Sequence, residues 1–335
     1  MVRFLKLCSL IAGFAAATMA NALVFNVTSP ASGTPTDPTF LGSNNTISFS
    51  ATSVDREITV DVAATNLDTN TVITREQKFT PTDSKVDSSI ALNFAAGTPE
   101  GNYQIVVTAE YTGDSTSLQT VTLTNLKLDI TKPKILEFNP GDKSYVGAGI
   151  VRIRAHISEA NFKMYTVQVG GQDIPNNTGT ALVNGTDMEV DWDTSGIIND
   201  GQQSISINIK DKAGNESTQT MQVTLDRIKP SVTIRSPGTS VAARSTFSVV
   251  ADIQDASTDS TSVQGVDVIL TKTDGSFLYR VPRVSFQGQG SQTNRWTGRV
   301  QGSKITLPKQ IILKVTAVDR AGNIAVVQTA TITVK

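Results

Sequence analysis

Two short motifs recur along the chain at a spacing near one hundred residues. Residues 129–135 (DITKPKI) return as residues 226–232 (DRIKPSV), 97 positions later. The pentapeptide D-x-A-G-N stands at residues 211–215 and again at residues 319–323, a spacing of 108. Because two independent motifs keep nearly the same period, the chain is predicted to consist of repeated domains of about a hundred residues each.

The local pattern within these repeats predicts β-strands. Residues 151–157 (VRIRAHI) alternate apolar and polar side chains, and residues 57–62 and 247–253 show the same alternation. A period of two is typical of a strand with one buried face. Asn184-Gly185 and Asp274-Gly275 predict tight hairpin turns with positive φ angles. The middle repeat holds about seven such short strands, which is the number expected of a two-sheet sandwich.

Proline marks the predicted joints between the repeats. Pro133 and Pro230 each precede an apolar segment, and proline suits the first position of a strand because it cannot donate to a central ladder. The joints are short and poor in glycine, which favours a semi-rigid connection. We therefore expect an all-β, elongated rod of three tandem sandwiches, with domains at residues 23–132, 133–229 and 230–335.

These motifs resemble the bacterial Ig-like domain families, which occur as tandem repeats on secreted and surface proteins. The middle repeat carries the full pattern, with Trp192 opening W-D-T-S-G, then Asp200-Gly201, then D-x-A-G-N. The third repeat keeps Trp296 and the pentapeptide, whereas the divergent first repeat has Phe94 at the tryptophan position. The resemblance implies an immunoglobulin-like sandwich in each repeat, but it leaves the function open because such folds carry many roles.

The N-terminus predicts export from the cytoplasm. Arg3 and Lys6 precede an apolar run at residues 7–17, and the small residues 20–22 supply a cleavage site. This order is typical of a secretory signal peptide, expected at residues 1–22, and the run is too short for a membrane span of about 20 residues. Cys8 lies inside the signal, so the mature chain is expected to contain no cysteine. We expect a secreted protein, whether extracellular, at the cell surface or periplasmic, without a transmembrane segment.

The inventory of reactive side chains argues against catalysis. His156 is the single histidine, so a Ser-His-Asp triad has one possible base, and a cysteine nucleophile is lacking after export. Zinc sites need several His or Cys ligands. His156 falls on the polar phase of its strand beside Arg154, which favours a surface histidine over a catalytic one. We expect no enzyme activity, no catalytic residue and no cofactor.

The aspartates at the joints allow two interpretations. Asp129, Asp211 and Asp226 are expected near the ends of the first two sandwiches, where gathered oxygen ligands could hold calcium. Alternatively, Asp211 and Asp319 open β-turns in which glycine and asparagine take the left-handed positions. Because the chain has no D-x-D-x-D run, we favour the turns and expect neither a metal site nor an effect of chelator on melting.

Charge is distributed unevenly along the chain. Residues 23–132 hold 6 basic and 12 acidic residues (−6), residues 133–229 hold 9 and 12 (−3), and residues 230–335 hold 12 and 6 (+6). The densest basic group is a set of four arginines that are candidate ligands of an anionic glycan, a lipid headgroup or an acidic protein: Arg280, Arg283, Arg295 and Arg299. An ordinary solvated strand face is the alternative. Nucleic acid is not expected as a partner, because no aromatic platform accompanies the arginines.

These features favour a binding or spacing role. We predict a non-catalytic structural spacer of the cell envelope, or an adhesion and protein-interaction module, whose partner is a protein or glycan at the envelope. The alternative is an accessory protein that binds carbohydrate or an anionic polymer. Trp192 and Trp296 could stack on sugars, but their matching repeat positions and inward phase favour core residues.

Overall fold

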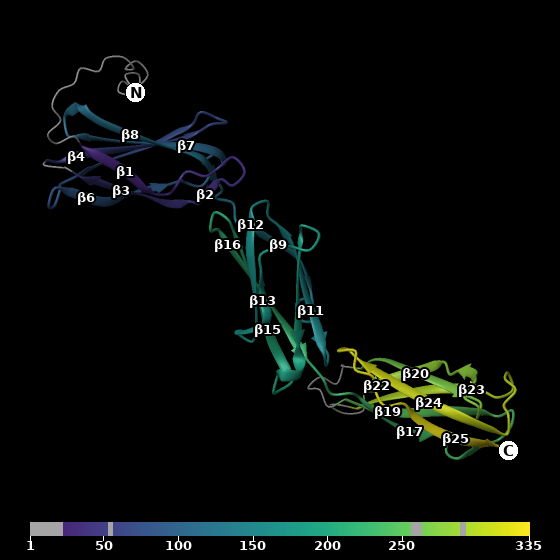
Figure 1. The fold of residues 1–335 in the computed structure, drawn as a ribbon. Helices are drawn as coiled ribbons and strands as arrows, with labels where there is room; N and C mark the ends of the chain where they lie inside the picture. Colours follow the sequence, from purple (N-terminus) through teal and green to yellow (C-terminus); the bar gives the residue numbers. More distant parts are fainter. Residues whose placement is uncertain (1–22, 53–55, 256–262, 289–292) are drawn as a thin grey trace. The chain divides into compact units, whose positions relative to one another are not determined.

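The computed structural model describes residues 23–52, 56–255, 263–288 and 293–335. These residues form two compact units, one running to Thr131 with Lys212–Asn215 added, the other made of Lys132–Asp211 and Glu216–Lys335. The six sheets within them fall into three pairs, and each pair encloses its own hydrophobic core (Figure 1). The predicted all-β class with three sandwiches is confirmed. The predicted signal peptide lies outside the described residues.

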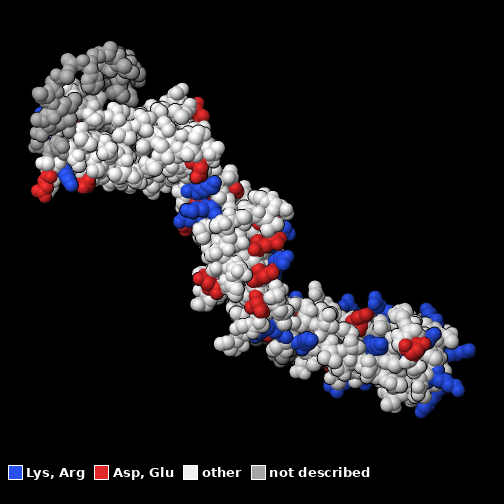
Figure 2. All heavy atoms as spheres, viewed as in Figure 1, with Lys and Arg blue, Asp and Glu red and all other residues white. Residues whose placement is uncertain are grey.

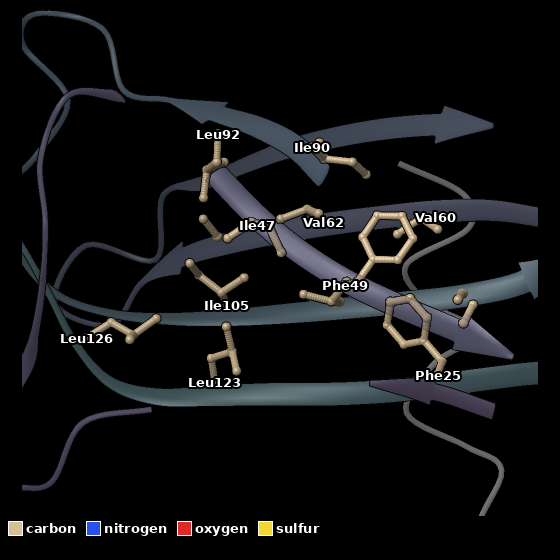
Figure 3. Packing of buried hydrophobic residues seen from close by; sticks show 14 of the residues in the cluster. Phe25, Ile47, Phe49, Val60, Val62, Ile90, Leu92, Ile105, Leu123 and Leu126 are labelled. Atoms are coloured by element: carbon tan, nitrogen blue, oxygen red, sulfur yellow. The ribbon is translucent and has the colours of Figure 1, made fainter. Parts of the chain in front are cut away.

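The first sandwich pairs a three-stranded sheet, β1-β3-β6, with a five-stranded sheet, β2-β8-β7-β4-β5. Its strands are β1 (Val24–Ser29), β2 (Thr39–Leu41), β3 (Asn44–Thr52), β4 (Ile58–Asn66), β5 (Val72–Phe79), β6 (Lys85–Asn93), β7 (Gly101–Tyr111) and β8 (Asp114–Leu128). Figure 3 shows inward residues of both sheets in one core; Phe25 and Phe49, on the neighbouring strands β1 and β3, have ring centroids 5.3 Å apart. Phe94, at the position of the missing tryptophan, is buried beside Tyr103.

The middle sandwich pairs the sheet β14-β11-β9 with the sheet β10-β16-β15-β12-β13. Its strands are β9 (Lys134–Asn139), β10 (Tyr145–Val146), β11 (Ile150–Ser158), β12 (Phe162–Val169), β13 (Gln172–Gly179), β14 (Asp187–Asp193), β15 (Gly201–Asp211) and β16 (Glu216–Leu225). A 3-10 turn, η2 (Thr194–Gly196), follows β14 and is capped by the Asp193 side chain. Trp192 is 1% exposed and lies in the core with the inward residues of β11 and β15, as predicted.

The third sandwich pairs the sheet β17-β19-β23-β22 with the sheet β18-β25-β24-β20-β21. Its strands are β17 (Ser231–Ser236), β18 (Ser240–Val241), β19 (Thr246–Gln254), β20 (Val263–Thr271), β21 (Phe277–Arg280), β22 (Arg283–Gly288), β23 (Thr293–Gln301), β24 (Gln310–Asp319) and β25 (Gln328–Val334). Trp296 is 2% exposed in its core, which confirms the second tryptophan assignment. The tip of its six-membered ring packs against Gly298.

The predicted turns form where the sequence placed them. Asn184 and Gly185 have φ angles of 52° and 78°; in the second turn Gly275 has a φ of 86°, but Asp274 does not have the predicted positive φ. Val183 N donates to Asp187 O across the first turn, and Gly275 N donates to Lys272 O in the second. Within the described ranges, no helix has both the length and the apolar character needed to cross a membrane.

Candidate metal centre

Three carboxylates from distant parts of the sequence meet inside the second unit. Asp226 directly follows β16, Asp255 directly follows β19, and Asp319 ends β24. Each residue offers one carboxylate oxygen, and these oxygens all lie within 4.8 Å of one another. Asp226 is 2% exposed, and Asp255 and Asp319 are fully buried. We refer to these three residues as the joint cluster.

The D-x-A-G-N turn positions Asp319 within the joint cluster. Asp319 Oδ1 accepts from Asn323 N at 2.8 Å, and Gly322 takes the left-handed conformation with a φ of 85°. The expected turn and its left-handed glycine are present, whereas Asn323, also expected to be left-handed, does not have a positive φ. The Asn323 side chain does more, however, because its Nδ2 donates both to Asp319 Oδ2 at 2.8 Å and to the backbone carbonyl of Asp226 at 2.7 Å.

Asp226 is held by hydrogen bonds of its backbone N and of one carboxylate oxygen. Its N donates to Val146 O at 2.9 Å, and its Oδ1 accepts from Ile228 N at 3.1 Å. Its Oδ2 is buried and accepts a hydrogen bond from no described residue. A buried carboxylate oxygen without a donor is costly, because nothing replaces the water that it has lost.

Burial and neighbouring charge together disfavour the ionised form of Asp226. Burial is the largest influence and raises its pKa from 3.8 to about 6, against the lowering effect of the Ile228 hydrogen bond. The negative charges of Asp255 and Asp319 also raise the pKa. A cation among these groups would relieve both effects, since it attracts the ionised form and supplies the missing partner of Oδ2.

The donor set fits calcium. Calcium binds six to eight oxygens at 2.3–2.6 Å, so two ligands on opposite sides of the ion lie about 4.8 Å apart. The oxygens of the joint cluster lie within that spacing. Magnesium requires distances of 2.0–2.1 Å and keeps most of its waters, which suits three closely gathered carboxylates less well. The cluster contains neither nitrogen nor sulfur, the ligands that dominate zinc sites.

The sequence repeats these acidic positions in the preceding repeat. Asp129 corresponds to Asp226 in the recurring joint motif, and Asp211 corresponds to Asp319 in D-x-A-G-N. Both are buried. In the first unit, Asn215 Nδ2 donates to the backbone carbonyl of Asp129 at 2.9 Å, as Asn323 does to Asp226. The asparagine of the pentapeptide therefore makes the same contact with the joint aspartate twice.

The four candidate arginines do not form one free patch. Arg295 Nε donates to Asp252 Oδ1 at 2.8 Å, and Arg235 bonds the other oxygen of Asp252 at 2.9 Å. Arg280 pairs with Asp267 at 3.0 Å. Among the described residues, Arg283 and Arg299 have no carboxylate within 4.0 Å. Arg295 and Arg299 do share the outward face of β23, with Trp296 inward as predicted.

His156 belongs to a ladder of ion pairs on the outward face of the sheet β14-β11-β9. Its Nδ1 lies 2.8 Å from Asp187 Oδ1, and Arg154 bonds the other oxygen of Asp187 at 2.7 Å. The hydrogen bond with His156 is the largest influence that lowers the pKa of Asp187. The surface position predicted for His156 is confirmed, since its side chain is 40% exposed.

Two other acidic side chains of the middle sandwich accept hydrogen bonds from backbone N–H groups. Asp142 Oδ1 accepts from Gln222 N at 2.9 Å, and Asp193 Oδ1 accepts from Ser195 N at 2.9 Å. Asp200 instead binds Arg227, accepting from its Nε at 2.6 Å and from its backbone N at 2.8 Å. Arg227 also donates to Ile197 O at 2.8 Å, so the segment that follows Asp226 is anchored to the middle sandwich.

Sequence reasoning missed Asp255 and the role of Asn323. Asp255 stands in no motif, and only the meeting of β16, β19 and β24 at their ends brings it to Asp226. A signal existed for Asn323, because both copies of D-x-A-G-N end in an asparagine that a turn alone does not need. The preference against a metal rested on the lack of a D-x-D-x-D run, which tests only ligands that are close in sequence.

Comparison with known proteins finds similar solved structures but no matching family or curated protein. Similar solved structures include fibronectin(III)-like modules of Clostridium thermocellum CbhA, at 14% identity and a TM-score of 0.40 over 61% of this chain and 94% of that one. A 1.5-MDa bacterial ice-binding adhesin matches at 16% identity and a TM-score of 0.33, covering 93% and 98%. A Ca2+-stabilized adhesin from an Antarctic bacterium matches at 18% and 0.35, covering 95% and 75%.

Proposed function

We propose that the protein is a secreted, non-catalytic spacer or adhesion module of the cell envelope, whose middle and third sandwiches are joined through a calcium ion. The ion would be held by Asp226, Asp255 and Asp319. The observation that carries this proposal is the buried joint cluster with the undonated Oδ2 of Asp226. Calcium would bring positive charge to the cluster and would coordinate Asp226 Oδ2, which accepts a hydrogen bond from no described residue.

The three ligands belong to different parts of the second unit. Asp226 follows the last strand of the middle sandwich, whereas Asp255 and Asp319 end strands of the third. An ion bound by all three carboxylates resists their separation, because a carboxylate that moves away loses its attraction to the ion. Arg227 adds to this effect, since its bonds to Asp200 fix the chain immediately after Asp226. A joint held in this way suits a spacer, which must transmit position along its length.

Calorimetric titration of the mature chain, residues 23–335, tests the site after treatment with a chelator. We expect a measurable heat of calcium binding at this site, and weaker binding of magnesium. Calcium should also raise the melting temperature followed by tryptophan fluorescence, because a ligand that binds only the folded state stabilises it by about 2.7 kcal/mol at a hundred times its Kd. Trp192 and Trp296 report one sandwich each, and the first sandwich contains no tryptophan.

Two variants with the same chemical change separate the site from general electrostatics. Asp226→Asn removes a ligand of the joint cluster, so the calcium heat and the thermal shift should both be lost. Asp267→Asn is the matched control, because Asp267 is half exposed and paired with Arg280 away from the cluster. It should retain both effects. A wild-type chain that gives neither heat nor thermal shift with calcium would contradict the proposal.

Export and the domain boundaries belong to the same proposal. We place the mature N-terminus at Leu23 and the boundaries within a few residues of Lys132 and Lys229. The three hydrophobic clusters support these positions, since their members end at Ile130, Leu225 and Val334. Mass spectrometry of the exported chain should find Leu23 first. Limited proteolysis in chelator should cut near the two lysines, and cleavage within the sandwiches instead would refute the boundaries.

A further inference from the structure

The third sandwich separates its charges between its two ends. Asp255 and Asp319 lie at the end of the sandwich that contains the joint cluster. Asp252 and Asp267 are neutralised by ion pairs with arginines. The opposite end carries cations on its loops, which Figure 2 shows as blue side chains beside the end of the chain. The excess positive charge of this sandwich is therefore gathered at one end.

Four residues define this surface, which we call the basic end: Arg244, Lys272, Lys304 and Lys309. The turn with Arg244 precedes β19, Lys272 follows β20, Lys304 follows β23, and Lys309 precedes β24. Strand pairing brings these loops to one end, because Thr246 is opposite Gln301 and Thr271 is opposite Ile312.

Backbone hydrogen bonds fix the loops of the basic end. Gly302 N donates to Ser245 O at 3.0 Å, which joins the loop of Lys304 to the turn of Arg244. Lys304 N donates to Gln301 O at 2.9 Å. Val334 N donates to Lys309 O at 2.8 Å. The backbone is thus secured without the charged side chains, which remain exposed.

The cations of the basic end are not neutralised within the molecule. Across the ranges that the structure describes, none of the four has a carboxylate within 4.0 Å. Asp274 is the acidic residue nearest in sequence to Lys272, and its carboxylate accepts from Ser276 N at 2.8 Å and Ser276 Oγ at 2.7 Å. Those bonds are the main cause of its lowered pKa, with a smaller contribution from Lys272. Arg283 and Arg299, on the adjoining strands, extend the positive field.

We propose that the basic end binds an acidic polysaccharide, a chain with regularly repeated carboxylate or sulfate groups. The cations stand on loops from both sheets, so they match charges repeated along a polymer better than a single small anion, which needs converging donors. Like charges held together without partners repel one another, and a polyanion relieves that repulsion while it releases counterions.

A membrane surface fits this end less well. Peripheral membrane binding combines basic residues with apolar side chains that enter the lipid. Phe277, 64% exposed at the start of β21, is the large exposed apolar side chain that pairing places at this end, opposite Thr271. Three of the other large exposed apolar residues of this sandwich, Ile324, Val326 and Val327, follow Asp319 at the opposite end, and the fourth, Val284, lies on the edge strand β22. One aromatic side chain supports contact with a polymer better than it supports insertion.

Binding of the mature chain to dextran sulfate, compared with uncharged dextran, tests the proposal. The measurement is made in chelator, so that calcium neither bridges the polymer nor fills the joint cluster. We expect binding to dextran sulfate and to polygalacturonate, no binding to dextran, and an affinity that falls by about tenfold or more between 50 and 300 mM salt. Equal binding to dextran, or binding that is independent of salt, would overturn the proposal.

Matched charge reversals locate the site. In one variant, Lys272, Lys304 and Lys309 are changed to Glu, and in the control, Arg75, Lys78 and Lys85 of the first sandwich are changed to Glu. Both variants alter the net charge equally and replace exposed side chains. We expect the first to lose about tenfold or more in affinity for dextran sulfate and the control to lose less than about threefold.

Two further measurements keep this result interpretable. A second variant with Lys272, Lys304 and Lys309 changed to Gln should show the same direction of change if the Glu variant unfolds, and Trp296 fluorescence reports folding of the third sandwich. Equal losses in the control would show attraction to net charge and would refute the basic end as the site. Binding to phosphatidylglycerol vesicles without binding to either acidic polymer would assign the surface to a membrane and overturn the proposal.

Discussion

Replacing Asp226 with asparagine is expected to change stability in opposite directions with and without calcium. In chelator, the wild-type protein carries a carboxylate whose pKa is raised from 3.8 to about 6 by burial and by its acidic neighbours. At neutral pH, where Asp226 is ionised, this rise in the pKa corresponds to a destabilisation of the folded state by about 3 kcal/mol. Asparagine keeps an acceptor for Ile228 N and removes the charge, so Asp226→Asn should stabilise the ion-free protein by up to about 3 kcal/mol.

Asp226 also determines the direction in which the stability of the ion-free protein changes with pH. The folded pKa of Asp226 lies above the unfolded value, so between about pH 4 and pH 6 the folded state binds more protons than the unfolded state. Its stabilising contribution is therefore fully present below the unfolded pKa and is lost as the pH rises through about 6. Wild-type protein in chelator should lose up to about 3 kcal/mol over this range from this group, and Asp226→Asn should not.

Urea unfolding followed by tryptophan fluorescence measures both effects. Because unfolding of several domains need not be two-state, Asp267→Asn is measured in parallel and only differences are compared. With saturating calcium the order should reverse, since wild-type protein gains the binding energy that Asp226→Asn lacks. The reasoning would be refuted if Asp226→Asn destabilised the ion-free protein at pH 7.5, or if calcium stabilised both proteins equally.

Three further predictions concern packing and the joint. Trp192→Ala and Trp296→Ala should each lower the stability of their own sandwich by about 3–5 kcal/mol, seen as a shift of one transition in differential scanning calorimetry; unshifted transitions would contradict the core assignment. Gly298→Ala places a Cβ 2.3 Å from the Trp296 ring and 2.8 Å from Pro282 O, so it should cost about 1–3 kcal/mol in the same assay, and a neutral effect would show that the ring can move. Asn323→Ala leaves acceptors of Asp226 and Asp319 without a donor and should cost about 2 kcal/mol or more by urea unfolding, and an unchanged stability would show that these contacts contribute little.

Much of each sandwich could be predicted because its signals are local. Alternation along a strand assigned inward faces correctly, including those of Trp192 and Trp296, since side chains point to opposite faces with a period of two. Asn184-Gly185 and Asp274-Gly275 predicted turns from conformational preference alone. The repeated joint motifs set the number of domains. None of these inferences needs to know which strands are neighbours.

The candidate metal centre could be predicted only in part. Asp226 and Asp319 both stand in repeated motifs, but the sequence identified only Asp226 as a possible oxygen ligand and Asp319 as a turn residue. Asp255 has no such mark, and its place depends on where β19 ends relative to β16 and β24. The same applies to the Asn323 side chain, which reaches the carbonyl of a residue 97 positions earlier. A search for ligands that are close in sequence could not find this arrangement.

The arginines of the third sandwich show the same division. Their sequence established a basic segment, but register decided which charges are neutralised. Asp252 lies opposite Arg295 in the β19–β23 pair and binds it, whereas Arg299 lies opposite Ser248 and has no such partner. The sequence by itself determined strands, inward faces and the repeat, because alternation and turn preference act between near neighbours. Only the tertiary structure decided which carboxylates share a site and which cations remain free, because those contacts depend on register and on the meeting of strand ends far apart in the chain.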